Sequence, residues 1–187
     1  MKGVIFNLVE EVVRAERGDD SWDEIVDDAG VSGAYTSLGS YPDSDLVDLA
    51  ETVATHVGTD TSSVIRHVGH HGLAILATRY PEFFDPHDDV RSFLLTLNEI
   101  IHPEVRRLYP GAHVPEFVYR IESDDVLEMV YTSERGRCDL AEGLVIGAGQ
   151  HYGQRVHVEQ PTCLHRGDDV CVLRVTKRRC VDASTVT

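Results

Sequence analysis

The chain has 187 residues, 42% of them hydrophobic, which is enough for one domain with an ordinary core. Its 32 acidic and 17 basic residues give a formal net charge of -15, which disfavours nucleic-acid binding, although such a charge also serves solubility alone. With no bilayer-length apolar run and no signal-peptide pattern, we expect a cytoplasmic protein that has no membrane partner. There, the four Cys are expected to be thiols or metal ligands.

The first hundred residues show the apolar spacing of amphipathic helices. Ile5, Leu8 and Val9 begin one inward stripe close to the N-terminus. Ser21 and Glu24 have the spacing of a capping box, which predicts a second helix that ends at Gly30. Further helices are predicted from Asp43 or Ser44 to Gly58, from Thr61 or Ser62 to Pro81, and over about residues 89–97.

A change of periodicity divides the chain after Pro115. Before it, Pro103 lacks the N–H of a continuous helix, so we expect a break near residues 98–101 and a short helix over 102–109. Strands are predicted over 117–121, 127–135, 155–159 and 170–176, the last two as a hairpin, with a helix over about 139–152. We therefore expect an α+β fold, in which a helical N-terminal subdomain packs on a C-terminal antiparallel sheet with helices. We expect a single domain over residues 1–178 and a tail over 179–187.

Two groups of polar residues predict a binding site. His102 has apolar neighbours, and an imidazole without a partner is costly in such surroundings. Tyr131, Ser133 and Arg135 alternate along a predicted strand, so their side chains should share one face. The guanidinium fork suits a carboxylate or phosphate, and two hydroxyls lie beside it. The pattern predicts an anion clamp that faces a histidine; the alternatives are an ordinary helix-end histidine and an exposed polar strand.

Five motifs along the chain carry a family resemblance. They are Met1-Lys2-Gly3-x-Ile5-Phe6, Ile101-His102-x-Glu104-Val105-x-x-Leu108-Tyr109-Pro110-x-Ala112, Pro115, Tyr131-x-Ser133-x-Arg135, and Ala141-Glu142-Gly143-Leu144-x-x-Gly147. Together they resemble the haem nitric oxide/oxygen binding (H-NOX) family over essentially the whole chain. The resemblance implies a haem b pocket between the two halves. It makes His102 the axial iron ligand, Tyr131, Ser133 and Arg135 the propionate clamp, and Pro115 a contact that distorts the porphyrin.

The same resemblance implies which gas the haem binds. Relatives that hold oxygen use a tyrosine on the helix after the clamp, where this chain has Leu140. The expected neighbours are Ile5, Ala74, Leu144 and Thr78, whose hydroxyl should satisfy its own helix. We predict a five-coordinate ferrous haem that binds NO and CO but no stable O2. NO would release His102 and move the short helix. This non-enzymatic sensor would thereby signal to a partner such as a histidine kinase or a cyclic-dinucleotide enzyme.

The cysteines form a second candidate site. The segment from Cys163 to Cys171 resembles one that holds a structural, redox-sensitive zinc in a subset of the family, but this chain has Gln160 where that subset has Cys. Cys138, Cys163 and Cys171 would be three zinc ligands, with Cys180 or His165 as the fourth. The alternative is thiols without function. A zinc-thiol redox sensor with little dependence on haem is thus the alternative function, and binding of an aromatic or lipid ligand in the same slot is a third.

A group of histidines suggests one more metal site. His67 and His71 are spaced to share a helix face, with His70 beside them. The sequence places no third ligand near them. Solvated histidines therefore explain this group better than a metal does.

Overall fold

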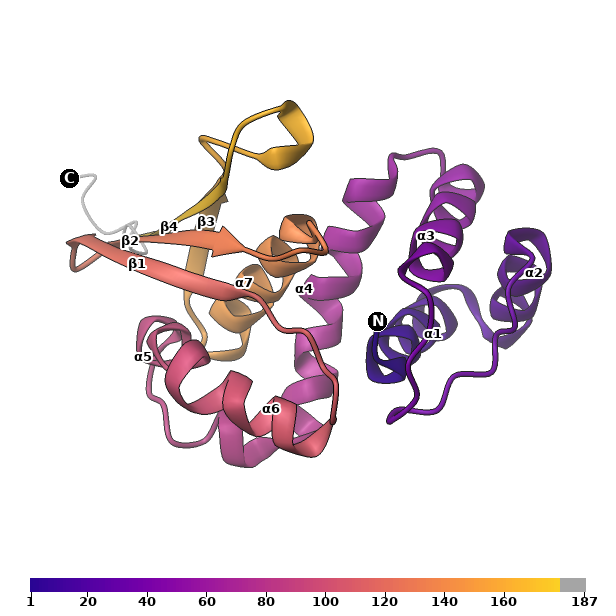
Figure 1. Ribbon diagram of the computed structural model, residues 1–187, viewed down its shortest axis with the longest axis horizontal. Helices are drawn as coiled ribbons and strands as arrows, with labels where there is room; N and C mark the ends of the chain where they lie inside the picture. The colour runs from indigo at the N-terminus through magenta and orange to yellow at the C-terminus, as the bar shows by residue number, and fades with distance from the viewer. Residues whose placement is uncertain (179–187) are drawn as a thin grey trace, which may run out of the picture.

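The N-terminal half consists of four helices, which Figure 1 shows at the centre and right of the molecule. They are α1 (Gly3–Arg17), α2 (Asp19–Ala29), α3 (Asp43–Val57) and α4 (Thr61–Arg79). This computed structural model describes residues 1–178, so the predicted tail over 179–187 and Cys180 lie outside the described residues. Among the described helices, none combines the length and apolar character needed to cross a membrane.

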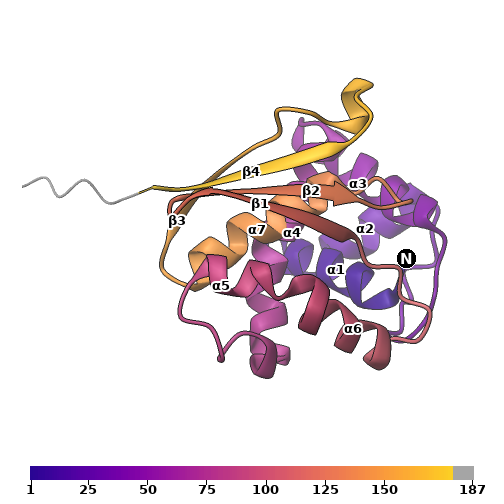
Figure 2. The ribbon, with the colours of Figure 1, turned by 60° about the vertical axis from the view of Figure 1, so that its left-hand side comes forward.

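The second half joins short helices to one antiparallel sheet. Its elements are η1 (Pro81–Phe83), α5 (Val90–Leu95), η2 (Leu97–Ile101), α6 (His102–Leu108), β1 (Glu116–Ser123), β2 (Val126–Thr132), α7 (Cys138–His151), β3 (Arg155–Glu159), η3 (Leu164–Arg166) and β4 (Cys171–Arg178). The strand order is β1-β2-β4-β3, and β3 pairs with β4 as the sequence predicts. In Figure 2 the sheet lies above α7, and α5 and α6 lie below it. The expected α+β architecture is confirmed.

Two hydrophobic clusters meet along α4 and α7. One lies among α1, α2, α3 and α4 and contains Phe6, Ile25 and Leu49, each fully buried. The other lies between the sheet and helices α4, α5 and α7, and contains Met129 and Leu173. The central helices thus separate the two halves of the fold and contribute side chains to both.

Glycines let α4 and α7 cross unusually close to one another. A Cβ on Gly143 would lie 2.0 Å from the Arg66 carbonyl oxygen, and one on Gly147 would lie 2.5 Å from that of His70. Real Cβ atoms do not approach backbone oxygens so closely, so neither position accepts a larger residue without moving a helix. The glycines in the sequence motif of residues 141–147 therefore set the spacing between the two central helices.

Three local features differ from the sequence-based expectations. The segment before His102 is a π-helix, η2, rather than a break, so the chain is helical on both sides of Pro103. Strand β2 ends at Thr132, three residues earlier than predicted. The predicted capping box is wrong, because α2 begins at Asp19 after Gly18 and the Ser21 hydroxyl donates to the Arg17 carbonyl instead.

Candidate functional site

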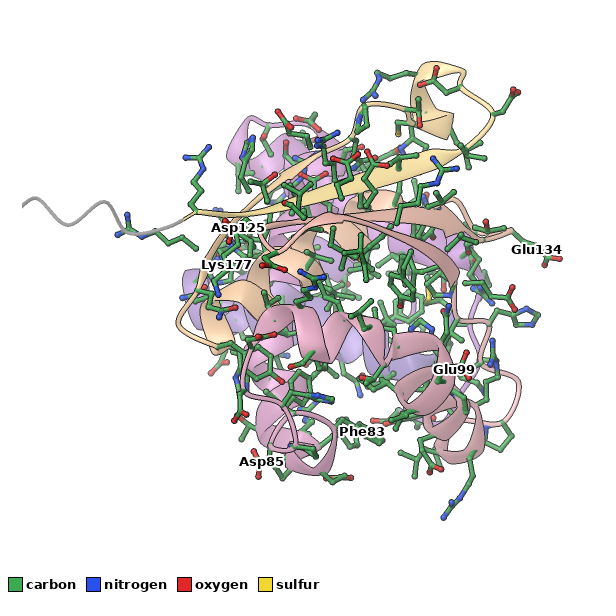
Figure 3. All side chains as sticks on the ribbon, turned by 90° about the vertical axis from the view of Figure 1, so that its left-hand side faces the viewer. Phe83, Asp85, Glu99, Asp125, Glu134 and Lys177 are labelled. Atoms are coloured by element: carbon green, nitrogen blue, oxygen red, sulfur yellow. The ribbon has the colours of Figure 1, made fainter. Side chains whose placement is uncertain are left out.

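An apolar cavity lies between the N-terminal helices and the second half of the chain. Its volume is about 270 Å³, counted as the space open to the centres of water molecules. One water needs only about 10–15 Å³ on that measure, so the cavity accommodates a far larger ligand. Its lining includes Ile5 from α1, Leu76 from α4, Phe93 from α5 and Leu144 from α7. Phe83, which is labelled in Figure 3, is another of the residues that line it.

His102 lies on the cavity wall at the start of α6, directly after the π-helix. Its Nδ1 is buried and has no hydrogen-bond partner among the described residues. Burial, and secondarily the positive charge of Arg106, lowers the pKa of His102 to about 4, while the Pro115 carbonyl acts in the opposite direction. The imidazole is therefore neutral at neutral pH, and a neutral, partly desolvated imidazole is a good metal ligand.

The predicted clamp residues Tyr131, Ser133 and Arg135 all line the cavity, but not as one strand face. Because β2 ends at Thr132, Ser133 and Arg135 belong to the turn that leads to α7. The labelled side chain between them, Glu134, extends to the edge of the molecule in Figure 3. The alternating-strand argument is thus wrong, and the turn brings the side chains to the cavity instead.

Tyr131 is the most buried member of this group. Its hydroxyl accepts a hydrogen bond from the Arg137 backbone N–H at 3.0 Å, which orders the start of α7. Burial raises the pKa of Tyr131, although hydrogen bonds from Ser133 and Arg137 oppose that effect. The tyrosine therefore remains a neutral phenol at the cavity wall.

Arg135 forms an ion pair with Asp43, the first residue of α3. The same carboxylate accepts a hydrogen bond from the amino terminus of Met1 at 2.5 Å. Burial alone would raise the pKa of Asp43, but these two positive groups outweigh it and lower the pKa overall. The guanidinium at the cavity edge thus has a carboxylate partner within the chain, and its role toward a haem propionate stays a prediction. Nothing in the sequence pattern indicated Asp43, because it lies 92 residues away.

The wall that α1, α4 and α7 contribute to the cavity is entirely aliphatic within these described helices. It includes Ile5, Leu140 and Leu144, as predicted. The prediction for Ala74 is wrong: this residue is exposed on α4, where Leu73 and Leu76 point to the cavity instead. Thr78 is exposed, and its hydroxyl donates to the Ala74 carbonyl at 2.9 Å, so it satisfies its own helix as expected.

The cavity also has aromatic residues that the sequence analysis did not assign to it. Tyr80, directly after α4, and Tyr109, directly after α6, both line it, and their hydroxyls contact each other. Burial raises the pKa of Tyr109 to about 12. Phe83, Phe84, Phe93 and Phe117 also line the cavity. For Tyr80, Phe83 and Phe84 the only signal in the sequence was the apolar character of the segment around Pro81.

The three described cysteines converge where β4 and α7 begin. The Sγ atom of Cys163 lies 3.6 Å from that of Cys138 and 3.9 Å from that of Cys171. All three are buried, and burial raises the pKa of the Cys138 and Cys171 thiols. The trio predicted from sequence is thus brought together within one small volume.

The fourth position of this cluster is less well defined. Gln160 does not face the thiols as a ligand, since its amide donates to the Glu142 carboxylate at 2.6 Å. His165 Nε2 donates to the Gly136 carbonyl at 2.7 Å. Cys180 lies outside the described residues. The geometry therefore supplies three candidate zinc ligands and no assigned fourth.

Comparison with known proteins supports the interpretation of the cavity. The model of the family described as Haem-NO-binding matches residues 2–160. The crystal structure of an H-NOX protein from S. oneidensis in the Fe(II)NO ligation state is 31% identical, with a TM-score of 0.89, and the match covers 96% of this chain and 100% of that chain. The NMR structure of an H-NOX domain from Shewanella oneidensis in the Fe(II)CO state is 31% identical, with a TM-score of 0.86 and coverage of 96% and 99%.

A more distant structure shares the fold alone. The Fe(II) unliganded H-NOX protein from K. algicida is 23% identical, with a TM-score of 0.85, and the match covers 97% of this chain and 98% of that chain. No curated protein sequence matches the chain significantly. The family match spans both halves of the fold and includes every residue that lines the cavity except Met1. The chain therefore belongs to the haem nitric oxide/oxygen binding (H-NOX) family, whose members are haem-binding gas sensors.

Proposed function

We propose that this protein is a non-enzymatic sensor that binds NO, and also CO, at a ferrous haem b ligated by His102. The observation that carries the proposal is the imidazole of His102, which lines an apolar cavity and whose buried Nδ1 has no hydrogen-bond partner among the described residues. A buried polar nitrogen left alone is costly, so a ligand that satisfies this ring is the economical explanation.

The residues of the cavity fit a haem, which is a large apolar ring with two carboxylates. His102 would bind the iron, and Arg135 would pair with a propionate, with Ser133 and Tyr131 beside it. Pro115 would contact the porphyrin, and so would the aliphatic wall of Ile5, Leu140 and Leu144. When bound, ferrous haem supplies an open iron position for a diatomic gas. Haem b, held without covalent attachment, is favoured because the sequence has no C-x-x-C-H motif.

The lining of the cavity supports selectivity for NO and CO over O2. Oxygen on ferrous haem becomes partly negative and needs a hydrogen-bond donor to remain, whereas NO does not. The described helices α1, α4 and α7 line the cavity with aliphatic side chains such as Leu140 and Leu144, which cannot donate a hydrogen bond to oxygen. The hydroxyls of Tyr80 and Tyr109 contact each other and belong to segments outside that wall, directly after α4 and α6. Relatives at about a third identity have been solved in Fe(II)NO and Fe(II)CO states.

The attachment of α6 supports a relay that begins at His102. Of its seven residues, all described, none is fully buried, so the helix is held weakly by its own packing. Release of His102 would remove the strongest constraint on its first residue. We propose that the resulting displacement of α6 is read by a separate cytoplasmic protein, such as a histidine kinase or a cyclic-dinucleotide enzyme. The free thiols of Cys138, Cys163 and Cys171 are consistent with that reducing compartment.

The absorption spectrum of the ferrous protein with and without NO tests this function. We expect a strong Soret band that shifts when NO is added under anaerobic conditions. Purified protein that neither retains nor takes up haem would overturn the proposal, and binding of aromatic or lipid ligands by that protein would favour the third function considered above.

We retain zinc only as a proposed second cofactor, bound by the cysteines. The comparisons give no support for a zinc-thiol sensor that works without haem. Convergence of Cys138, Cys163 and Cys171 nevertheless suits a tetrahedral zinc, with Cys180 or His165 as a fourth ligand. Elemental analysis should then find zinc that a Cys163→Ser variant lacks. Metal-free protein whose thiols all react would show that the thiols serve packing alone.

A further inference from the structure

Three metal-ligating side chains meet on the outer surface, away from the cavity and from the cysteines. His67 and His71 lie one turn apart on α4, and Glu16 lies near the end of α1. Their ligand atoms all lie within 4.8 Å of one another. His67 Nε2 is 2.6 Å from Glu16 Oε1, and the two imidazole rings have centroids 4.2 Å apart. Glu16 therefore supplies the third ligand that the sequence does not place near the histidines, since it lies 51 positions from His67.

We propose that Glu16, His67 and His71 form a surface site for a borderline divalent transition-metal ion of the Zn²⁺ class. Two imidazoles and one carboxylate are the ligand set that such ions prefer over Mg²⁺ or Ca²⁺, which select oxygen ligands. Exposure of all three residues leaves the remaining coordination positions to water. The site is thus an open one, in contrast to the buried thiol cluster.

Only small side-chain movements separate the present geometry from a coordinated one. Zinc bonds of about 2.0–2.1 Å place tetrahedral ligand atoms about 3.3 Å apart. The ligand atoms of Glu16, His67 and His71 are at most 4.8 Å apart. Rotation of these exposed side chains can bring the atoms to the tetrahedral spacing. The metal would replace the present contact between His67 and Glu16. Neighbouring His70 is not a ligand, because its Nε2 bonds to the Gln150 side chain at 2.7 Å.

The charges around the cluster favour a cation. Glu16 supplies the negative charge that a dication needs close by. With net charge -15, the whole chain also attracts cations rather than repelling them.

A bound ion would connect two helices that line the gas-binding cavity. Helix α1 carries Ile5 to the cavity, and α4 carries Leu73, which is two residues after His71. The metal site lies on the outer side of the same two helices and would fix their separation. Metal occupancy would therefore stiffen one wall of the cavity without any contact to its ligand.

Zinc stoichiometry in matched variants tests the site. The full chain would be dialysed against ZnCl2 at equal haem content, comparing wild type with a His67→Ala/His71→Ala variant. The thiol cluster is present in both, so the difference between them isolates the surface site. We expect the double variant to bind one equivalent less. His157→Ala is the matched control, because His157 is also exposed and lies beside a glutamate, Glu159, but has no third ligand within residues 1–178.

Two further measurements identify the ligands themselves. On zinc addition, the imidazole ¹⁵N resonances of His67 and His71 should shift while that of His157 does not. Glu16→Gln keeps the side-chain size but weakens a ligand, so it should lower the affinity for the surface equivalent. Equal stoichiometry and affinity in wild type and the double variant, or shifts confined to other histidines, would overturn the proposal. Unchanged circular dichroism without metal controls for folding, since all substituted residues are exposed.

Discussion

Asp43 and Arg135 form an ion pair that joins the first residue of α3 to the turn between β2 and α7. The pair lies at the rim of the cavity, where Arg135 is also a lining residue, and the amino terminus of Met1 approaches the same carboxylate. One carboxylate thus links the N-terminal helices to the opposite half of the molecule. The two halves of the protein are therefore connected at Arg135, the residue that would also pair with a haem propionate.

Replacing Asp43 with Asn should lower the stability of the haem-free protein by about 1 kcal/mol or less, because solvent screens a pair that is partly exposed. The folded protein lowers the pKa of Asp43, so this contribution is present above the unfolded pKa of about 3.9. It is lost as the pH falls through the lower folded value. Urea unfolding of both proteins across this range should show their difference shrinking in acid.

Asp48→Asn provides the control for the change in charge, since Asp48 is exposed on the same helix. Its stability should follow that of wild type at every pH. An Asp43→Asn difference that persists unchanged in acid would contradict the ion-pair explanation.

His102→Ala should abolish or strongly weaken the Soret band, because the cavity loses its only candidate iron ligand in the wall that α6 forms. The measurement is haem absorbance relative to protein after reconstitution. Added imidazole should restore part of the band in a His102→Gly variant by occupying the space of the missing side chain. His113→Ala is the matched control, since His113 also borders the cavity but is exposed. Equal haem retention in both alanine variants would remove His102 from the iron.

Leu140→Tyr should give the ferrous protein a stable oxygenated spectrum in air, which we expect wild type to lack. Leu140 lies on the aliphatic wall and is nearly buried, so a phenol there would place a hydrogen-bond donor inside the cavity. Leu140→Phe adds the same ring without the hydroxyl and should behave like wild type. An oxygenated spectrum in the Phe variant would show that ring size, rather than the donor, controls oxygen binding.

Gly143→Ala should destabilise the protein by about 1–3 kcal/mol, the usual cost of overpacking a tight interior. The added methyl group would lie 2.0 Å from the Arg66 carbonyl oxygen, and backbone cannot swing aside as a side chain can. Alanine is otherwise the better helix former by about 1 kcal/mol, so the sign of the effect is informative. Chemical denaturation measures it. A gain in stability would contradict the close crossing of α4 and α7.

The sequence predicted the elements of this fold well because apolar periodicity and strong terminators mark them. Helix α3 ends before Gly58, and α7 ends just before Gly153 as expected. The sequence-based predictions of the end of β2 and of the position of Ala74 are wrong because tertiary contacts determine both. The turn after Thr132 cannot be told from a strand by alternation alone, and the direction in which Ala74 points depends on a rotation of α4 that Gly69 and Gly143 set through packing.

The site was predictable as far as local motifs reach. His102, Pro115 and the residues of the clamp are close in sequence and lie on one cavity. Other contacts join residues far apart in the sequence. They are the pairs Asp43–Arg135, Tyr80–Tyr109 and Glu16–His67. No local pattern encodes such contacts, because each depends on how separate helices pack.

The π-helix before His102 determines how α6 can move. Asn98, within that segment, donates to the Phe117 carbonyl at 2.6 Å and accepts from the Phe117 N–H at 3.1 Å. This two-point clip fastens the wide turn to strand β1. His102 follows about one turn later. If α6 moves, we therefore expect it to pivot about Asn98 rather than slide along its own axis, with the largest displacement near Leu108, at its far end.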